Sequence, residues 1–420
     1  MQIKTILNRC LKFKAFMIEK VTMTEDIVNP ALVVDIRPRR NSRPVCSRCE
    51  TPGTVYDTEP RPRRFEWIPL LDFHVFFRYP MRRVDCKVCG TPVVERVEWA
   101  DGKSPVSHSL ALFLARWARR LSMSEVANVF GTSWHKVYQS MKEVVDYGMA
   151  HRSLAGVTAL GVDEIHYRSG HAGFCTMVWQ LDEGNRRLLE MEDSRKSMAL
   201  NACLSRLGNE FCAGIRFVCT DMWQPFITCI RRRLPGALNI LDRFHLVMNL
   251  NKAIDKVRAA EVRELKQQGF KQVLTHSKYC FLKRRENLTP KQDVKLRDLL
   301  RRPLKTVRAY LLKEDFQAMW EYSAPAWATW FLRKWCTRAM RSRLPPLRRY
   351  VKNIRKHEPL IINWFRAKKA FSNSITEGLN RQVNLVTRRA FGYRSFEVFR
   401  TVLFHDLGRL PEPPYFRGFS

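Results

Sequence analysis

The chain has 420 residues, and its 74 Lys and Arg against 40 Asp and Glu give a formal net charge of +34. A charge of this size is typical of proteins that neutralise nucleic-acid phosphates, with a merely solvated or ribosomal-type basic surface as the alternative. The 45% hydrophobic and 11% aromatic content excludes a disordered basic tail, and the length allows roughly two to four packed domains.

Export and membrane insertion are not expected. No stretch approaches the roughly 20 apolar residues of a membrane helix, and the basic N-terminal segment lacks the long apolar run of a secretion signal. Of the 12 cysteines, those outside two C-x-x-C pairs lie singly in apolar runs and are expected to be reduced packing residues. The sequence therefore predicts a protein of the reducing cytoplasm with no membrane partner.

The first part of the chain predicts a small zinc-binding domain. Residues 1–40 carry few landmarks and form an N-terminal segment, whereas 41–98 contain short strand-like runs. The two C-x-x-C pairs lie in this second range: Cys46, Cys49, Cys86 and Cys89. This spacing brings two thiolates of each pair to one tetrahedral metal, so we expect a zinc ribbon with one structural Zn²⁺ and a strand pair over 75–86. The alternatives are two unrelated pairs or a redox-active pair.

Residues 105–152 predict a helix-turn-helix domain. Apolar positions at helical spacing flank a turn at Gly131, and we expect Ser124 to cap the first helix and Ser133 the second. The second helix would enter the major groove of DNA. Its candidate DNA-binding side chains are Trp134, His135, Lys136, Gln139 and Lys142. An ordinary helical hairpin is the alternative.

Strand and helix signals alternate from 157 to 250, which predicts an α/β domain with a mixed sheet. Two short β-branched runs end in acidic residues, Asp163 and Asp221, and a charged Asp in a sheet is costly unless a metal or partner compensates it. The next strand ends in the motif Asp242-x-x-His245. His245 is a candidate for positioning a phosphate, a water or a carboxylate.

A further acid, Glu377, lies at the start of a helical stretch near the C-terminus. Carboxylates from separate elements are what a two-metal phosphoryl-transfer site needs, so Asp163, Asp221 and Glu377 form the candidate site. Asp242 competes with Asp221 for the role of middle ligand. Each acid also has a structural alternative: a turn residue at Asp163, a helix cap at Asp221 and an exposed helical residue at Glu377.

The range 251–365 is rich in Lys, Arg, Leu and Trp and predicts a helical insertion, after which 366–410 returns to the sheet domain. Five tryptophans of the insertion are candidates for contact with flanking DNA or a flipped base: Trp320, Trp327, Trp330, Trp335 and Trp364. At helical spacing most of them are expected to be core residues instead.

Four segments carry a resemblance to a known family: GVDEIHYRSGH, CTDMWQPF, LDRFHLVMNLNKAIDKVR and SNSITEGLNRQVNLVTRRAFGYRSFEVFR. With the C-x-x-C pairs and the helix-turn-helix, the chain resembles the ISL3-type insertion-sequence transposases over nearly its whole length. The D-x-x-H motif looks like one shared with the Mutator and hAT transposases. The resemblance implies an RNase H-like core with a helical insertion, and it makes Asp163, Asp221 and Glu377 a DDE triad.

The implied function is that of a DNA transposase from a prokaryotic insertion sequence, cytoplasmic and associated with the nucleoid. The triad would hold two Mg²⁺ (or Mn²⁺) ions for cleavage at the transposon end and for transfer of the freed 3′-hydroxyl to target DNA. The zinc ribbon and helix-turn-helix would bind the terminal inverted repeats, and a homodimer or larger oligomer is expected. A zinc-dependent DNA-binding regulator with an inert RNase H-like region, and a structure-specific nuclease, are the alternatives.

Overall fold

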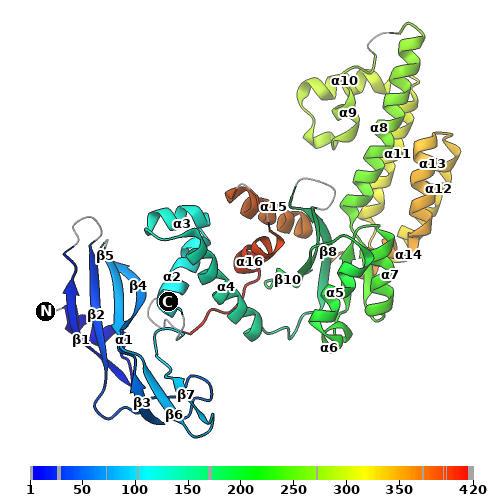
Figure 1. The fold of residues 1–420 in the computed structure, drawn as a ribbon. Helices are drawn as coiled ribbons and strands as arrows, with labels where there is room; N and C mark the ends of the chain where they lie inside the picture. The colour runs from blue at the N-terminus through cyan, green and yellow to red at the C-terminus, as the bar shows by residue number, and fades with distance from the viewer. Residues whose placement is uncertain are drawn as a thin grey trace. The chain divides into compact units, whose positions relative to one another are not determined.

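A computed structural model describes the backbone of residues 3–25, 30–71, 73–101, 104–168, 173–270, 273–370, 373–390, 392–393 and 395–414 (Figure 1). The chain divides into two compact units. The first comprises Met1–Ser153 with Arg388–Ser420, and the second comprises Leu154–Thr387.

A four-stranded sheet opens the first unit, in the order β1-β2-β5-β4. Its elements are α1 (Ile3–Leu11), β1 (Phe16–Met23), β2 (Ala31–Pro38), β4 (Arg63–Leu70) and β5 (Phe73–Tyr79). The first forty residues thus supply a helix and two strands, because alternating side chains such as Val34 and Ile36 are buried against Phe77 and Trp99. Strand β2 pairs with β5 in parallel, so this sheet joins residues 1–40 to the range that follows.

A separate antiparallel sheet contains β3 (Thr54–Thr58), β6 (Arg82–Cys86) and β7 (Thr91–Val94), in the order β3-β6-β7. The strand pair expected over 75–86 was wrong, because β5 and β6 belong to different sheets. Pro80 lies between the two strands and has no N–H to donate to a ladder, so the chain leaves one sheet there and enters the other.

The helices of the first unit are α2 (His108–Ala118), α3 (Met123–Val129), α4 (Trp134–His151) and α16 (Phe396–Leu407), and α16 packs against α4. The cap expected at Ser124 was wrong. Ser122 caps α3 instead, because its hydroxyl accepts from the N–H of Glu125 while that carboxylate accepts from the N–H of Ser122. The cap at Ser133 is confirmed, since its hydroxyl accepts from the N–H of Lys136.

A five-stranded mixed sheet forms the core of the second unit, in the order β10-β9-β8-β11-β12. Its strands are β8 (Ala159–His166), β9 (Phe174–Gln180), β10 (Arg187–Glu192), β11 (Phe217–Thr220) and β12 (Leu238–Leu241). The hairpin β9–β10 and the parallel pairs β8–β11 and β11–β12 confirm the predicted α/β core. Three helices cover one face through Leu160, Val162 and Val218: α5 (Ser197–Leu207), α6 (Asn209–Ala213) and α7 (Gln224–Arg233).

The rest of the second unit is helical, as predicted. It begins with α8, the long helix labelled in Figure 1, which starts two residues after the end of β12. Its helices are α8 (Arg243–Gln267), α9 (Lys278–Leu282), α10 (Pro290–Leu300), α11 (Lys305–Ala318), α12 (Pro325–Arg341), α13 (Pro345–Lys356), α14 (Glu358–Arg366) and α15 (Asn373–Arg389), with short 3₁₀ turns at Arg285–Asn287 and Met319–Glu321. Among the described residues, none of the helices combines the length and hydropathy of a membrane span.

Candidate active site

Three acidic residues stand in a row along one edge of the second unit's sheet. Strand β11 pairs in parallel with β8, with Cys219 opposite Gly161, and with β12, with Thr220 opposite Leu241. Continuing these registers past the end of β11 places Asp221 opposite Asp163 on one side and opposite Asp242 on the other. Because the carboxyl ends of parallel strands share one edge, residues far apart in the chain meet there.

Two hydrogen bonds hold the carboxylate of Asp163. Its Oδ2 accepts a hydrogen bond of 2.6 Å from Nδ2 of Asn380 on α15, and its Oδ1 accepts one of 2.8 Å from the N–H of Glu164. Burial raises the pKa of Asp163, and the charge of Asp221 raises it further, while the Asn380 hydrogen bond and nearby His245 oppose the shift. The ionised form of Asp163 is therefore disfavoured unless a positive charge lies nearby.

Asp221 follows β11 and orients the chain into α7. Its Oδ1 accepts a 2.9 Å hydrogen bond from the N–H of Trp223, which is itself the N-cap residue of α7. The helix-cap alternative for Asp221 is thus wrong, because the N-cap of α7 is Trp223 and the carboxylate of Asp221 closes a turn two residues before that cap.

Asp242 is the N-cap of α8 and has a basic neighbour. Its Oδ1 accepts a 3.0 Å hydrogen bond from the N–H of Phe244, and its Oδ2 lies 3.2 Å from Nδ1 of His245. Burial lowers the pKa of His245, but the ion pair with Asp242 and the charges of Asp163 and Asp221 outweigh burial and leave the pKa raised. The imidazole is therefore biased toward its cationic form beside the acidic edge.

Glu377 lies on α15. Its backbone position is three residues before Asn380, on the same side of the helix, and Asn380 contacts Asp163. The side chain of Glu377 lies outside the described residues. The backbone thus brings this part of α15 to the edge that carries Asp163.

Two polar residues at this edge were not predicted from the sequence. The carboxyl Oε1 of Glu164 and the amide Oδ1 of Asn380 are buried and accept no hydrogen bond within the described part of the chain. Burial raises the pKa of Glu164 to about 7, and the nearby charge of Asp221 contributes. The available signals were the adjacent acids Asp163 and Glu164 within an apolar strand, and the one-turn spacing of Asn380 from Glu377.

The four paired cysteines come together in the first unit, at the end of the β3-β6-β7 sheet. The Sγ atoms of Cys46 and Cys89 are 3.8 Å apart, those of Cys49 and Cys86 are 3.4 Å apart, and all four lie within 4.8 Å of one another. Hydrogen bonds from Thr51 lower the pKa of Cys49 to about 6, which favours its thiolate. Four sulfur atoms at this spacing are a donor set that suits Zn²⁺.

Helix α4 presents most of the predicted DNA-binding side chains to one groove of about 610 Å³. The predicted residues that line it are His135, Lys136, Gln139 and Lys142. Trp134 is not among them. Its ring is 40% exposed and stacks on Tyr138, with centroids 5.4 Å apart and planes at 16°.

Two of these groove cations already have acidic partners. The ammonium of Lys136 forms an ion pair with Glu66 of β4, and Nζ of Lys142 lies 3.0 Å from Asp146. The positive charge of the groove is therefore partly neutralised.

Comparisons with known proteins match most of the chain to transposases. Residues 160–403 match a family of transposases, the ISL3 type of DDE transposase. The chain is 27% identical over 392 residues to the transposase of insertion sequence IS1001 from Bordetella parapertussis, covering 92% of this chain and 94% of that protein. It is 26% identical over 411 residues to the transposase of IS1557 from two strains of Mycobacterium tuberculosis, covering 91% of this chain and 90% of theirs.

Among solved structures, the Drosophila P element transposase strand transfer complex aligns with a TM-score of 0.40 and 11% identity, over 72% of this chain and 91% of that one. The family match spans more than half of the chain, including Asp163 on β8, Asp221 directly after β11, and the helix that carries Glu377. The chain therefore belongs to the ISL3-type family of insertion-sequence transposases.

Proposed function

We propose that this transposase cleaves and joins DNA at an RNase H-like sheet whose acidic edge holds two divalent cations, Mg²⁺ or Mn²⁺. The observation that carries the proposal is the register that sets Asp163, within β8, beside Asp221, which directly follows β11. Glu377 would supply the third carboxylate, and its place on α15 near Asn380 supports this role.

The residues of the edge fit hard divalent cations. Their donors are carboxylate and amide oxygens, which Mg²⁺ and Mn²⁺ prefer. The raised pKa values of Asp163 and Glu164 reflect burial and the nearby charge of Asp221, and a bound cation would relieve both effects. The buried and unpartnered Oδ1 of Asn380 is a further oxygen available at this place.

Asp221 is the better candidate for middle ligand than Asp242. Both oxygens of Asp242 are engaged, one by the N–H of Phe244 and one by His245. Within the described residues, Asp221 accepts a side-chain hydrogen bond through Oδ1 alone, from Trp223. Asp221 therefore keeps an oxygen that can bind a cation, while Asp242 fixes the start of α8.

The residues around the edge would hold the DNA for an in-line displacement. When bound, the cations would activate the attacking oxygen and stabilise the leaving one. Asn380 fixes the rotamer of Asp163 through its 2.6 Å hydrogen bond. His245, whose pKa is raised by Asp242, would present a positive charge to a phosphate oxygen.

The first unit would recognise DNA. The four cysteines would hold one structural Zn²⁺, and the groove beside α4 would contact the terminal inverted repeats. A transposase that acts on two element ends would assemble as a homodimer or a larger oligomer.

A strand-transfer assay with pre-cleaved element ends and Mg²⁺ tests the catalytic proposal. Asp163→Asn, Asp221→Asn and Glu377→Gln should each reduce joining to background while end binding persists, because each removes a cation ligand without changing side-chain volume. Activity retained in Asp221→Asn but lost in Asp242→Asn would reverse the assignment of the middle ligand.

The same assay distinguishes the alternatives. A DNA-binding regulator would bind the ends without Mg²⁺-dependent nicking by the unaltered chain. A structure-specific nuclease would cut but would not join. Either result would overturn the proposed joining reaction.

A further inference from the structure

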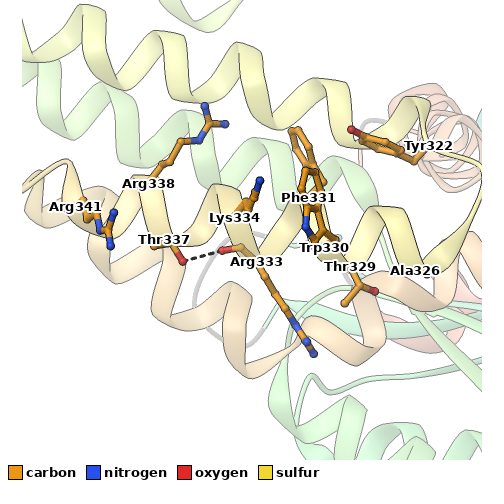
Figure 2. Close-up of a pocket in the computed structure, with 10 residues that line it drawn as sticks. All are labelled: Tyr322, Ala326, Thr329, Trp330, Phe331, Arg333, Lys334, Thr337, Arg338 and Arg341. Carbon is orange, nitrogen blue, oxygen red and sulfur yellow. Dashed lines mark hydrogen bonds between the residues drawn. The ribbon is translucent and has the colours of Figure 1, made fainter.

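Helix α12 has a buried side and an exposed side of very different chemistry. Its buried residues recur at helical spacing and pack into the core of the insertion: Ala328, Leu332, Trp335, Cys336 and Ala339. The exposed side carries aromatic rings near the start of the helix and cations on its later turns (Figure 2). Trp330, Phe331 and the cations line a cavity of about 1080 Å³, and Trp327 lies beside it, with its ring centroid 6.0 Å from that of Trp330. We call this cavity together with Trp327 the α12 groove.

The aromatic part of this surface is a pair of solvent-exposed tryptophans. Trp327 is 60% exposed and Trp330 is 47% exposed, with ring centroids 6.0 Å apart and planes at 85°. By contrast, Trp320, Trp335 and Trp364 are buried in the core of the insertion. Two adjacent exposed indoles are costly in water, so they indicate a binding surface and not packing.

The cationic part of the groove retains positive charge. Arg333 pairs with Glu358 at 2.7 Å, and Arg338 pairs with Asp315 at 3.0 Å. Across the ranges that the structure describes, no acid pairs with the two remaining cations, Lys334 and Arg341.

Lys334 joins the two kinds of chemistry. Its Nζ lies 3.9 Å from the centroid of the Trp330 ring, which fixes a positive charge directly on an indole face. Of the residues that the structure describes, no acid lines the groove, whose walls include Tyr322 and Phe331. The groove therefore offers flat apolar rings and positive charge within one short surface.

We propose that the α12 groove binds an unpaired DNA strand, with a base stacked on Trp327 and the phosphates beside Lys334 and Arg341. Stacking requires an exposed base face, which an unpaired strand presents and a duplex hides within its own stack. An acidic peptide would match the charge but offers no flat ring for each anionic group. The proposal rests on the DNA-joining function proposed above, because strand cleavage and joining expose unpaired nucleotides.

Affinity of the full-length protein for a fluorescein-labelled oligothymidylate tests the aromatic contact. Trp327→Ala should weaken binding roughly tenfold, because one stacking platform is lost, and Trp327→Phe should restore most of the affinity. Binding to a fully paired duplex of the same length should not change in either variant.

Tyr279→Ala is the matched control. Tyr279 is 57% exposed on α9 of the same insertion and also has lysines near its ring, but it lies outside the α12 groove. Its removal should leave oligothymidylate affinity unaltered. Equal losses in Trp327→Ala and Tyr279→Ala would contradict a groove-specific site, and so would an unchanged affinity in Trp327→Ala.

The charges are tested by salt dependence. Arg341→Gln and Lys334→Gln should each reduce the slope of log affinity against log salt by about 0.7, the value for one phosphate contact on a single strand. Displacement of the oligothymidylate by polyglutamate at equal charge concentration would show recognition of charge alone, as an acidic protein partner would give, and would overturn the proposal.

Oligothymidylate binding and strand joining can be tested separately. The Asp163→Asn variant should bind oligothymidylate as the unaltered protein does, because Asp163 lies outside the α12 groove. Loss of joining in Asp163→Asn together with normal oligothymidylate binding in Trp327→Ala would leave the DDE mechanism standing and remove only the α12 site.

Discussion

At the scale of single residues, the acidic edge depends on a hydrogen bond between distant parts of the chain. Asn380 donates to Asp163 across a sequence separation of 217 residues. The bond holds Oδ2 of the Asp163 carboxylate in place. The amide Oδ1 of Asn380 is buried beside it and has no hydrogen-bond partner among the described residues. Asn380 is thus a positioning residue for the carboxylate that begins the site.

Replacing Asn380 tests this role. Asn380→Ala should raise the Mg²⁺ concentration needed for half-maximal joining by roughly 10- to 100-fold, as losses of residues that orient metal ligands do. Thermal unfolding should change little. Asn384→Ala is the matched control, because Asn384 is an exposed amide on the same helix. An unchanged Mg²⁺ requirement in Asn380→Ala would exclude the positioning role.

At the scale of elements, a single carboxylate organises the start of β8. Asp182 accepts hydrogen bonds from the hydroxyl of Thr158 at 2.6 Å, from its N–H at 3.1 Å and from Nε2 of Gln180 at 3.1 Å. Burial raises the pKa of Asp182, but these hydrogen bonds outweigh burial and leave the pKa lowered. The folded state therefore favours the ionised carboxylate more strongly than the unfolded state does.

This shift predicts an acid-dependent loss of stability. The contribution of Asp182 should be fully present above its unfolded pKa of about 4 and should be lost as pH falls through the lower folded pKa. Asp182→Asn should lower the free energy of unfolding by about 1–2 kcal/mol at pH 7 and flatten its pH dependence below pH ~4. Urea unfolding across this pH range measures both effects, with Glu183→Gln, an exposed neighbour, as the control.

The β3-β6-β7 sheet has a very small buried apolar cluster. Its buried cluster consists of Cys46, Cys86 and Val93, so two of three members are candidate zinc ligands. A small three-stranded sheet with so few buried apolar groups is not expected to be stable alone. The metal would therefore supply much of its stability.

Metal analysis of the purified protein should find about one Zn²⁺ per chain. Cys46→Ser should abolish that content and expose the sheet to proteolysis, whereas Cys10→Ser, which changes an exposed cysteine outside the cluster, should retain the metal. Full zinc content in Cys46→Ser would contradict the assignment.

Individual strands were predictable from the sequence, but the pairing of strands into sheets was not. The strands that end before Asp221 and Asp242 follow from local runs of β-branched residues, so they were predicted at the right places. The split between β5 and β6 was missed, because strand partners are chosen by packing that local alternation does not record.

The tryptophans of the insertion show the same limit. Trp327, Trp330 and Trp335 lie on one helix at helical spacing, yet the first two are exposed and the third is buried and donates from Nε1 to the carbonyl of Leu312 at 2.7 Å. Composition identifies a tryptophan-rich helix, but only the packing of α12 separates core from surface. The role of Asn380 could not be predicted either, because it depends on the approach of α15 to β8.

At the scale of the whole molecule, the net charge of +34 should dominate encounters with DNA. Affinity for duplex DNA should fall by roughly 10³- to 10⁵-fold between 50 and 200 mM salt if about six to ten phosphates are neutralised. Titrations of a labelled duplex at several salt concentrations measure the slope. A slope near zero would show that phosphate contacts contribute little.

The division into two units also assigns the C-terminal segment differently from the range 366–410 taken from the sequence. Residues from Arg388 onward group with the first unit, where Arg389 donates to the carbonyl of Arg119 at 2.6 Å and pairs with Asp406. The preceding part of α15 belongs to the second unit with Asp163. One helix therefore contributes to both units.

Helix α8 connects the acidic edge to the insertion, so its length sets how the insertion is rotated relative to Asp242. Its 25 residues begin directly after Asp242 and continue without interruption into the helical insertion, over about 37 Å. Adding or deleting one residue within α8 would rotate everything beyond it by about 100° relative to Asp242, whereas a change of seven residues would nearly preserve the orientation. Length variation among functional relatives of this chain should therefore gather in the loops between the insertion helices, while the length of α8 stays fixed.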